Sequence, residues 1–398
     1  MGHRDNKRLL DKLVETLELP DSAYEKAVSR YRDLGEWLER PESTCNENNP
    51  HIFPQGSFRL GIAIRPLSGN EEYDLDLACN LREGVTSTTH TQKELKEKLG
   101  EELEKYRVAR NINSPLEPKH RCWRLDYADT LKFHMDIVPC IPESESKQQR
   151  LVAAMESYGM DSGLANNVST QAVAITDDRL PDYDKKPTDW MISNPLGYAV
   201  WFESRMQPIE QGRAGFSIEA KVDKIPTYKR KTPLQRAIQI LKRHRDQMFA
   251  KQSDSKPISV IITTLAARSY SGSSSLESTL AEALNTLNTF SKSGSDVVEN
   301  PVNPEENFAD RWSMPKYSHL KLKENFQLWV DRVTRDIELI LQSQDLDMLT
   351  ESINGNLSIS MESKVLEEVL GIENKPSPIP PASTAISTPV SKPWFDEK

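Results

Sequence analysis

This sequence has few cysteines, no long apolar run and no net positive charge, and each of these absences argues against a class of protein. The 4 cysteines among 398 residues lie far apart without a CxxC pair, which argues against a disulfide framework and against a zinc site. The best apolar run, Ile258 to Ala267, is too short to span a membrane, and the first ten residues lack the apolar core of a signal peptide. A net charge of −9 argues against a protein that mainly grips duplex nucleic acid. We therefore expect a cytoplasmic protein with no membrane contact.

The order of the apolar patterns predicts a mixed half followed by a helical half. Residues 1–40 carry leucines and valines at helical spacing, and residues 41–215 open with a loop-like stretch at 41–54. Predicted strands follow at 71–81, 121–127 and 131–141, with a charged helix at 91–106. Helical patterns dominate residues 216–372.

The last segment, residues 373–398, alternates Pro with Ser and Thr and is predicted to be disordered. It is typical of a plain solubilising tail. A tail that docks on a partner protein, or is covalently modified by one, is the alternative.

An acidic strand is the most unusual local pattern. Asp74 and Asp76 alternate with Tyr73, Leu75 and Leu77, so both carboxylates lie on one face of the strand and repel each other. A divalent cation would compensate that repulsion. A DxD pair alone is more often a solvated strand edge, so the interpretation needs support from elsewhere in the chain.

A later strand supplies a third carboxylate in the same pattern. Phe133, Met135 and Ile137 alternate with His134 and Asp136, and we interpret His134 as a hydrogen-bonded structural neighbour. Three aspartates on adjacent strands can hold two Mg²⁺ ions, with phosphate oxygens completing the coordination shells.

Upstream of the acidic strand, Gly56 and Ser57 precede a helix-forming stretch. Backbone amides and a hydroxyl at a helix N-terminus favour an anion.

The order GS, DxD and a single Asp resembles the polymerase-β-like nucleotidyltransferases. The stretches PQGSFRLGIAIRPLSGNEEYDLDLACNL, FHMDIVPCIP, SNPLGYAVWFESRM and NPVNPEENFADRW are similar to the bacterial CD-NTases, relatives of cyclic GMP–AMP synthase and of the oligoadenylate synthases. The matching segments run from Gln55 to Trp312, and the resemblance is to the clades lettered C and D.

The resemblance implies an α+β fold with two lobes. A polymerase-β-like core with a mixed sheet (41–215) and an oligoadenylate-synthase-like helical domain (216–372) would enclose the active site in their cleft. The N-terminal helices (1–40) would pack across both lobes.

The family's site residues carry over position by position. Gly56 and Ser57 match contacts to the donor triphosphate, and Asp74, Asp76 and Asp136 match the catalytic metal ligands.

Further matches lie in the helical half. Lys242 and Ser259 match a lysine and a serine that relatives supply to the triphosphate. Most of the Lys/Arg-rich run at 229–245 remains typical of a solvated helix face. Asn307 and Asp310 match the nucleotide-binding rim, although a polar segment between prolines is also typical of a stiff loop.

The function implied is metal-dependent synthesis of a cyclic di- or trinucleotide second messenger from nucleoside triphosphates, with pyrophosphate release, in anti-phage defence. ATP is expected among the substrates, with GTP or other NTPs beside it, and two Mg²⁺ ions, replaceable by Mn²⁺, as cofactors. Expected partners are defence-operon proteins that regulate the enzyme or modify its tail. DNA is not expected as an activator, because the chain lacks the close His/Cys cluster of the animal enzyme's zinc-bearing insertion. The alternatives are a non-cyclising nucleotidyltransferase acting on RNA or protein, and an inactive nucleotide-binding module.

Overall fold

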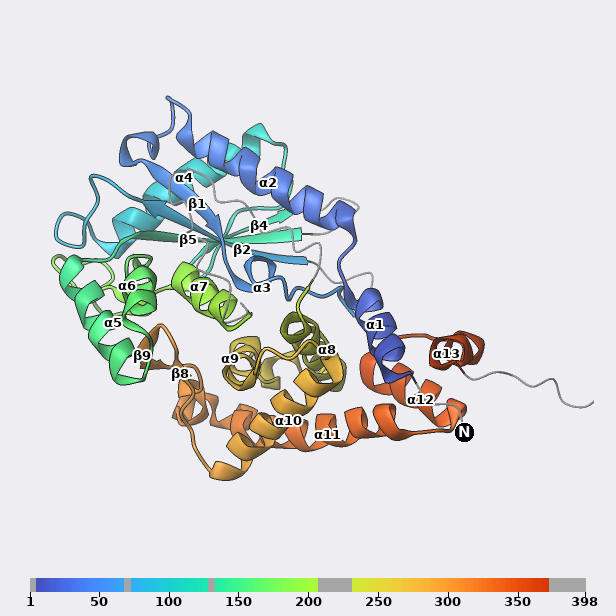
Figure 1. The fold of residues 1–398 in the computed structure, drawn as a ribbon. Helices are drawn as coiled ribbons and strands as arrows, with labels where there is room; N and C mark the ends of the chain where they lie inside the picture. The colour runs from blue at the N-terminus through green and yellow to red at the C-terminus, as the bar shows by residue number, and fades with distance from the viewer. Residues whose placement is uncertain (1–4, 68–72, 128–132, 207–230, 372–398) are drawn as a thin grey trace, which may run out of the picture.

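A mixed β-sheet lobe and a helical bundle make up this chain (Figure 1). The computed structural model describes residues 5–67, 73–127, 133–206 and 231–371. The tail at 373–398 and the expected lobe boundary near 215 therefore lie outside the described residues.

The sheet has the strand order β1-β2-β5-β4-β3, and β6 and β7 continue it from the C-terminal end of β5. Because β2 runs parallel to β5 and the other neighbours run antiparallel, the sheet is mixed, as the sequence predicts. The strands are β1 (Pro50–Pro54), β2 (Tyr73–Leu81), β3 (Glu117–Pro118), β4 (Trp123–Tyr127), β5 (Phe133–Pro142), β6 (Val173–Ile175) and β7 (Met191–Ser193).

One face of the sheet is buried beneath α2 (Asp21–Glu39) and α4 (Gln92–Ala109), which lie above it in Figure 1. Leu75, Leu77 and Met135 face this apolar core and are completely buried. Since side chains alternate along a strand, the residues between them point to the opposite face. That face carries the acidic residues of β2 and β5.

A buried carboxylate ties α4 to the end of α2. Glu102 accepts hydrogen bonds from Arg40 and Lys105, each at 2.7 Å, and from the Thr44 backbone N–H at 3.3 Å. Burial acts to raise the pKa of Glu102, but these donors outweigh it and lower the pKa to about 2. The carboxylate is therefore satisfied and charged at neutral pH.

The second lobe packs its helices around α8 (Pro233–Met248), which contacts α9, α10, α11 and α12. Helix α8 starts with a capping box between Thr232 and Gln235 and with Pro233 in the first turn. None of the described helices combines the length and apolar character that crossing a bilayer requires. The other helices here are α9 (Ser259–Ser269), α10 (Leu276–Ser293), α11 (Leu322–Gln342), α12 (Leu346–Leu357) and α13 (Ser363–Leu370).

The two N-terminal helices divide between the lobes. Helix α1 (Asn6–Leu17) buries Leu9, Leu13 and Leu17 against α8, α10 and α13 of the bundle. Helix α2 packs instead on β1 and α4 of the sheet lobe.

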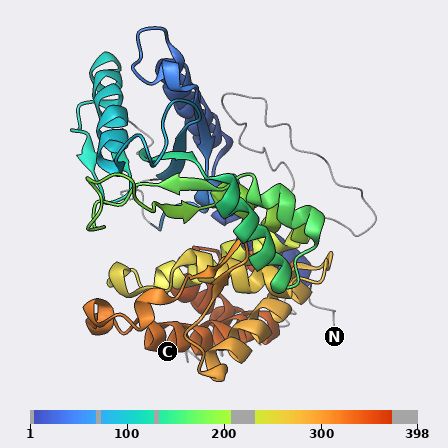
Figure 2. The same ribbon diagram turned by 90° about the vertical axis from the view of Figure 1, so that its left-hand side faces the viewer.

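The apolar core of the bundle also extends into the middle of the chain. Helices α5 (Glu145–Ser157), α6 (Ser162–Ser169) and α7 (Pro195–Met206) contribute buried residues to it. They lie between the sheet and the bundle (Figure 2). A single boundary in the sequence therefore does not separate the two apolar cores.

Two sequence expectations about local structure are wrong. The stretch at 41–54 is not all loop, because Ile52 and Phe53 pair with β2 as part of β1. The helical half contains an antiparallel hairpin, β8 (Glu299–Asn300) and β9 (Asn303–Asn307). Strand β1 begins and ends with proline, and strands β8 and β9 contain asparagine. Neither residue is typical of strands, so the sequence does not indicate these strands.

Candidate active site

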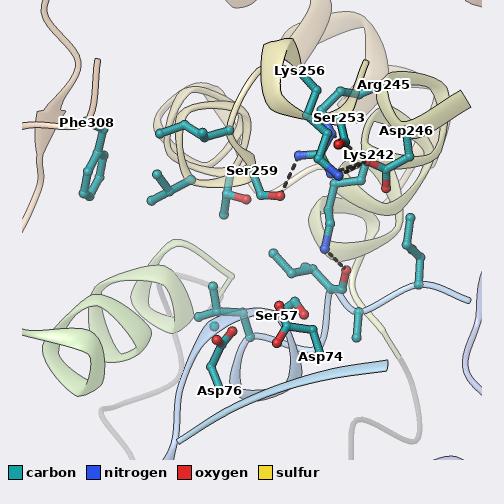
Figure 3. A pocket seen from close by; sticks show the side chains of 18 of the residues that line it. Ser57, Asp74, Asp76, Lys242, Arg245, Asp246, Ser253, Lys256, Ser259 and Phe308 are labelled. Atoms are coloured by element: carbon teal, nitrogen blue, oxygen red, sulfur yellow. Dashed lines mark hydrogen bonds and ion pairs between the residues drawn. The ribbon is translucent and has the colours of Figure 1, made fainter. Parts of the chain in front are cut away.

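The strand register brings the acidic residues of the sequence motifs together. Asp76 on β2 lies opposite Asp136 on β5, and Asp74 lies opposite His134. Asp74 and Asp76 line a cavity of about 1060 Å³ between the two lobes, and Figure 3 shows them beside Ser57. Asp136, on the neighbouring strand, does not itself line the cavity.

Gly56 lets the chain pass directly over Asp76. Its φ of +63° is in the left-handed region, and a Cβ there would come within 2.2 Å of the Asp76 Oδ2 atom. The Gln55 backbone N–H also donates to the Asp76 carbonyl at 2.9 Å. The Gly56–Ser57 turn therefore covers this carboxylate, and only glycine fits at the point of contact.

Asp76 is the most strongly perturbed carboxylate of the cavity. Burial, together with the neighbouring charges of Asp74 and Asp136, raises its pKa to about 8. A positive charge placed among the three would relieve both penalties.

Arg124 holds Asp136 in a fixed orientation. The two residues are paired across β4 and β5, and the guanidinium donates two hydrogen bonds of 2.7 Å to the two carboxylate oxygens. This bidentate contact fixes the plane of the carboxylate.

Two of the three carboxylates and a histidine form a candidate site for a divalent cation. Ligand atoms of Asp74, His134 and Asp136 lie within 4.8 Å of one another, and carboxylate oxygens are the donors that Mg²⁺ prefers. The Nε2 atom of His134 is 3.0 Å from Asp74 Oδ1. Burial acts to lower the pKa of His134, but the Asp74 contact outweighs it and raises the pKa. His134 is thus a partner of Asp74, and whether it is structural, as interpreted from the sequence, or a metal ligand stays untested.

Three side chains of α8 clamp the loop that follows the Gly56–Ser57 turn. Gln235, Gln239 and Lys242 donate to the carbonyls of residues 60, 63 and 62 respectively, each at 2.9 Å. This confirms that the three share one face of the helix, as their spacing predicts. The clamp brings Lys242 to the cavity wall opposite Asp74 (Figure 3).

Lys242 is a buried cation with spare donors. Burial, together with the nearby charge of Arg245, lowers its pKa to about 8. One ammonium hydrogen is engaged by the Ile62 carbonyl, which leaves two for an anion in the cavity.

Ser259 begins α9 at the same wall. Its hydroxyl accepts a 2.6 Å hydrogen bond from Arg245, and no side chain caps this helix end. The first-turn amides of α9 are therefore available to an anion, together with the Ser259 hydroxyl.

Asn307 and Asp310, expected at the rim, do not line the cavity. The Asn307 carboxamide accepts from the backbone N–H groups of Val298 and Ala309 and donates to the Asp296 carbonyl. Through these three hydrogen bonds, the Asn307 side chain stabilises the hairpin and the turn after it. This geometry agrees with the stiff-loop alternative. Glu306 and Phe308, on either side of Asn307, line the cavity instead.

Sequence reasoning also missed Arg124 and Arg245 as parts of the site. Arg124 is detectable in principle, because it alternates with apolar residues on a strand next to the acidic ones. Arg245 stands in a basic run whose members look alike in the sequence, and only the packing of α8 against α9 distinguishes it.

Comparison with known proteins decides the family. Residues 50–139 match the model of the cyclic GMP-AMP synthase DncV-like nucleotidyltransferase domain, the segment that carries β1, the Gly56–Ser57 turn and all three aspartates. Over 309 residues the chain is 29% identical to a c-di-GMP synthase of Roseivirga ehrenbergii, covering 76% of this chain and 72% of that protein. The chain is a bacterial CD-NTase.

A second CD-NTase relative, the cyclic dinucleotide synthase CdnG of Bradyrhizobium diazoefficiens, is 26% identical over 328 residues, covering 76% of this chain and 69% of that protein. The structure of CdnG in complex with GTP has a TM-score of 0.62 and 20% identity to this chain, and covers 92% of this chain and 98% of that one. This likeness confirms the predicted two-lobed fold. The CD-NTase is a nucleotidyltransferase, and its placement near clades C and D stays a prediction.

Proposed function

We propose that this CD-NTase joins nucleoside triphosphates into a cyclic di- or trinucleotide and releases pyrophosphate at each step. The observation that carries the proposal is the arrangement of the cavity. Asp74 and Asp76 of β2 lie on one wall, next to Asp136 of the parallel strand β5, and Lys242, Arg245 and Ser259 lie on the other wall. A triphosphate fits between such walls, because cations and helix amides bind its oxygens, and the carboxylates opposite would hold metal ions that neutralise its charge.

The residues divide the work of one transfer. Gly56, Ser57, Lys242 and Ser259 hold the triphosphate, and Asp74, Asp76 and Asp136 would hold two Mg²⁺ ions, with Mn²⁺ as a substitute. When bound, the ions neutralise charge on the phosphates and favour an attacking alkoxide.

The acceptor's ribose hydroxyl forms the new bond to the α-phosphorus of the donor. The bond from that phosphorus to the β-phosphate bridging oxygen breaks, pyrophosphate leaves, and the hydroxyl proton passes to Asp136. Arg124 keeps the Asp136 carboxylate in one orientation for this step. A second transfer within the linear product closes the ring.

ATP and GTP are both proposed as substrates, on different grounds. ATP is expected from the family resemblance, whereas GTP is favoured by the relatives, one named a c-di-GMP synthase and the other solved with GTP. The anti-phage role, the cytoplasmic location, the defence-operon partners and the independence from DNA remain predictions from the sequence.

The test uses purified protein with labelled NTPs, singly and mixed, with Mg²⁺ or Mn²⁺. Products are treated with phosphatase and a 3′–5′-specific nuclease and resolved by mass. We expect a phosphatase-resistant product that disappears in the Asp74→Ala/Asp76→Ala double variant. A product with a free triphosphate end would favour the non-cyclising alternative. Nucleotide binding without any product, with RNA and protein acceptors also supplied, would favour the inactive binding module.

A further inference from the structure

Glu306 is a cavity carboxylate to which no catalytic step above assigns a role. It lies on β9, far along the chain from the three aspartates, and lines the same cavity. Its Oε2 atom accepts one hydrogen bond, from the Asn300 carboxamide at 2.7 Å. Within the described part of the chain, no lysine or arginine forms an ion pair with Glu306, and its Oε1 atom accepts no hydrogen bond.

The residues on either side of Glu306 make contacts outside the cavity. Glu305 points away and forms an exposed ion pair with Arg150 on α5, at 2.9 Å. Asn307 is engaged by the backbone of the hairpin. Successive side chains on a strand alternate between its faces, so Glu306 and Phe308 share the face that looks into the cavity.

The environment of Glu306 penalises its charge. Burial raises its pKa, and the hydrogen bond from Asn300 compensates this only in part. The charge of Arg121 also acts against this shift, and a carboxylate withdrawn from water is stabilised further by donors that arrive with a ligand.

Asn300 fixes the direction in which Glu306 presents its free oxygen. Asn300 is buried, and its own carbonyl oxygen accepts from the Val302 backbone N–H at 3.0 Å. With both ends of the carboxamide engaged, the Asn300 side chain is a rigid donor. The Glu306 carboxylate is therefore presented in one orientation before any ligand enters.

Phe308 adds a stacking surface beside this acceptor. Its ring is partly exposed, lines the cavity and rests edge-on against Tyr198, with ring centroids 6.1 Å apart. Figure 3 shows Phe308 on the opposite side of the view from Lys242 and Arg245. The cavity thus has a cationic end suited to phosphates and an aromatic end suited to a base.

We propose that Glu306 selects guanine, by accepting hydrogen bonds from the N1–H and the N2 amino group of a base stacked on Phe308. Guanine presents two adjacent donors on its Watson–Crick edge, which match the two oxygens of one carboxylate. Adenine presents an acceptor at N1, which a carboxylate repels. The inference rests on the proposed function, since it takes the cavity to hold nucleoside triphosphates.

The test measures binding before chemistry. The α,β-methylene analogues of GTP, ITP and ATP, which cannot transfer their nucleotide, are titrated calorimetrically with Mg²⁺ into wild type, Glu306→Gln and Glu305→Gln. Inosine lacks only the N2 amino group of guanine. The wild type should bind the three in the order guanine, inosine, adenine, with about a ten- to hundredfold span.

Glutamine at position 306 offers one donor and one acceptor, the complement of the adenine edge. Glu306→Gln should therefore lower the guanine-to-adenine affinity ratio at least about tenfold. Glu305→Gln should keep the wild-type ratio, because its side chain faces Arg150.

An unchanged guanine-to-adenine affinity ratio in Glu306→Gln would overturn the assignment. An equal loss of affinity for all three analogues would also overturn it and make Glu306 a structural residue. A wild type without base preference would overturn it as well. If the guanine preference and its loss in Glu306→Gln are found but no cyclic product forms from natural NTPs, the synthase function fails and the role of Glu306 stands.

Discussion

The acidic wall of the cavity, Asp74 and Asp76, comes from one strand, whereas the basic wall, Lys242, Arg245 and Lys256, comes from α8 and the segment before α9. On the acidic wall the His134 imidazole lies 3.0 Å from Asp74, whereas burial and the charges of Asp74 and Asp136 raise the pKa of Asp76 to about 8. On the basic wall Asp246 pairs with Arg245 at 2.6 Å and with Lys256 at 3.4 Å. Both walls therefore carry charge that their neighbours balance only in part. A cation would relieve Asp76 on the acidic wall, whereas a single carboxylate, Asp246, pairs with two of the three cations on the basic wall.

Removing one charge of the acidic wall should have the largest effect. Asp76→Asn should lower turnover by at least about a thousandfold, since a metal ligand contributes several kcal/mol to the transition state. Its melting temperature should not fall, because this position already disfavours the charged carboxylate and asparagine carries no charge. Turnover is measured by pyrophosphate release and stability by thermal unfolding, with the exposed Asp331→Asn as control. Retention of a tenth of the activity would contradict a metal-binding role.

A methyl group placed against the acidic wall should come next. Gly56→Ala introduces a Cβ 2.2 Å from Asp76 Oδ2 at a φ of +63°, so the turn or the carboxylate has to move. We expect about a hundredfold loss of turnover, because small displacements of catalytic groups have effects of this size. Gly159→Ala, also at positive φ but with nothing within 4 Å, separates backbone strain from the clash. Equal effects of the two variants on turnover would argue against the contact.

The basic wall should respond more weakly and in a pH-dependent way. With its pKa lowered to about 8 by burial, Lys242 loses its proton as the pH rises through 8, and the KM for NTP should increase there. Lys242→Met should show a KM about ten- to a hundredfold higher at neutral pH, as expected for loss of a charged hydrogen bond. Lys242→Arg stays charged and should lack the alkaline rise. If Lys242→Arg showed the same increase in KM at alkaline pH, the increase would come from the titration of another group.

An exposed ion pair between the lobes should matter least. Arg150 and Glu305 expose 65% and 66% of their side chains, so solvent screens the contact. Arg150→Ala should change the free energy of unfolding by less than about 1 kcal/mol and leave turnover within about twofold. Chemical denaturation and pyrophosphate release measure the two quantities. A large loss of turnover would show that this pair sets the closure of the cavity.

Some features of the two walls can be predicted from residue spacing alone. The residues of β2 and β5 alternate strictly, so the carboxylates and the face they share follow from period-two spacing. Their adjacency depends on a parallel register between β2 and β5 that spacing does not encode. The sequence supports it only as a hypothesis, which the order of the motifs and the family resemblance strengthen. The face of α8 with Gln235, Gln239 and Lys242 also follows from spacing.

Other features arise only in three dimensions. The contact between Gly56 and Asp76 depends on a left-handed backbone at one residue, and the grip of Arg124 on Asp136 depends on which strand pairs with β5. The β8–β9 hairpin carries proline and asparagine where strands are usually β-branched, so its cavity-facing Glu306 was overlooked in favour of Asn307.

The position of α1 has a consequence for biosynthesis. Its apolar stripe is buried against α8 and α13, which follow it by more than two hundred residues, because α8 begins at Pro233. At ribosomal rates of about 5–20 residues per second, the stripe would wait roughly 10 to 40 seconds for its first partner. The sheet lobe, whose strands and covering helices lie within the first half of the chain, can form in that interval. The bundle is thus completed last, and the nascent chain carries an exposed apolar helix until then.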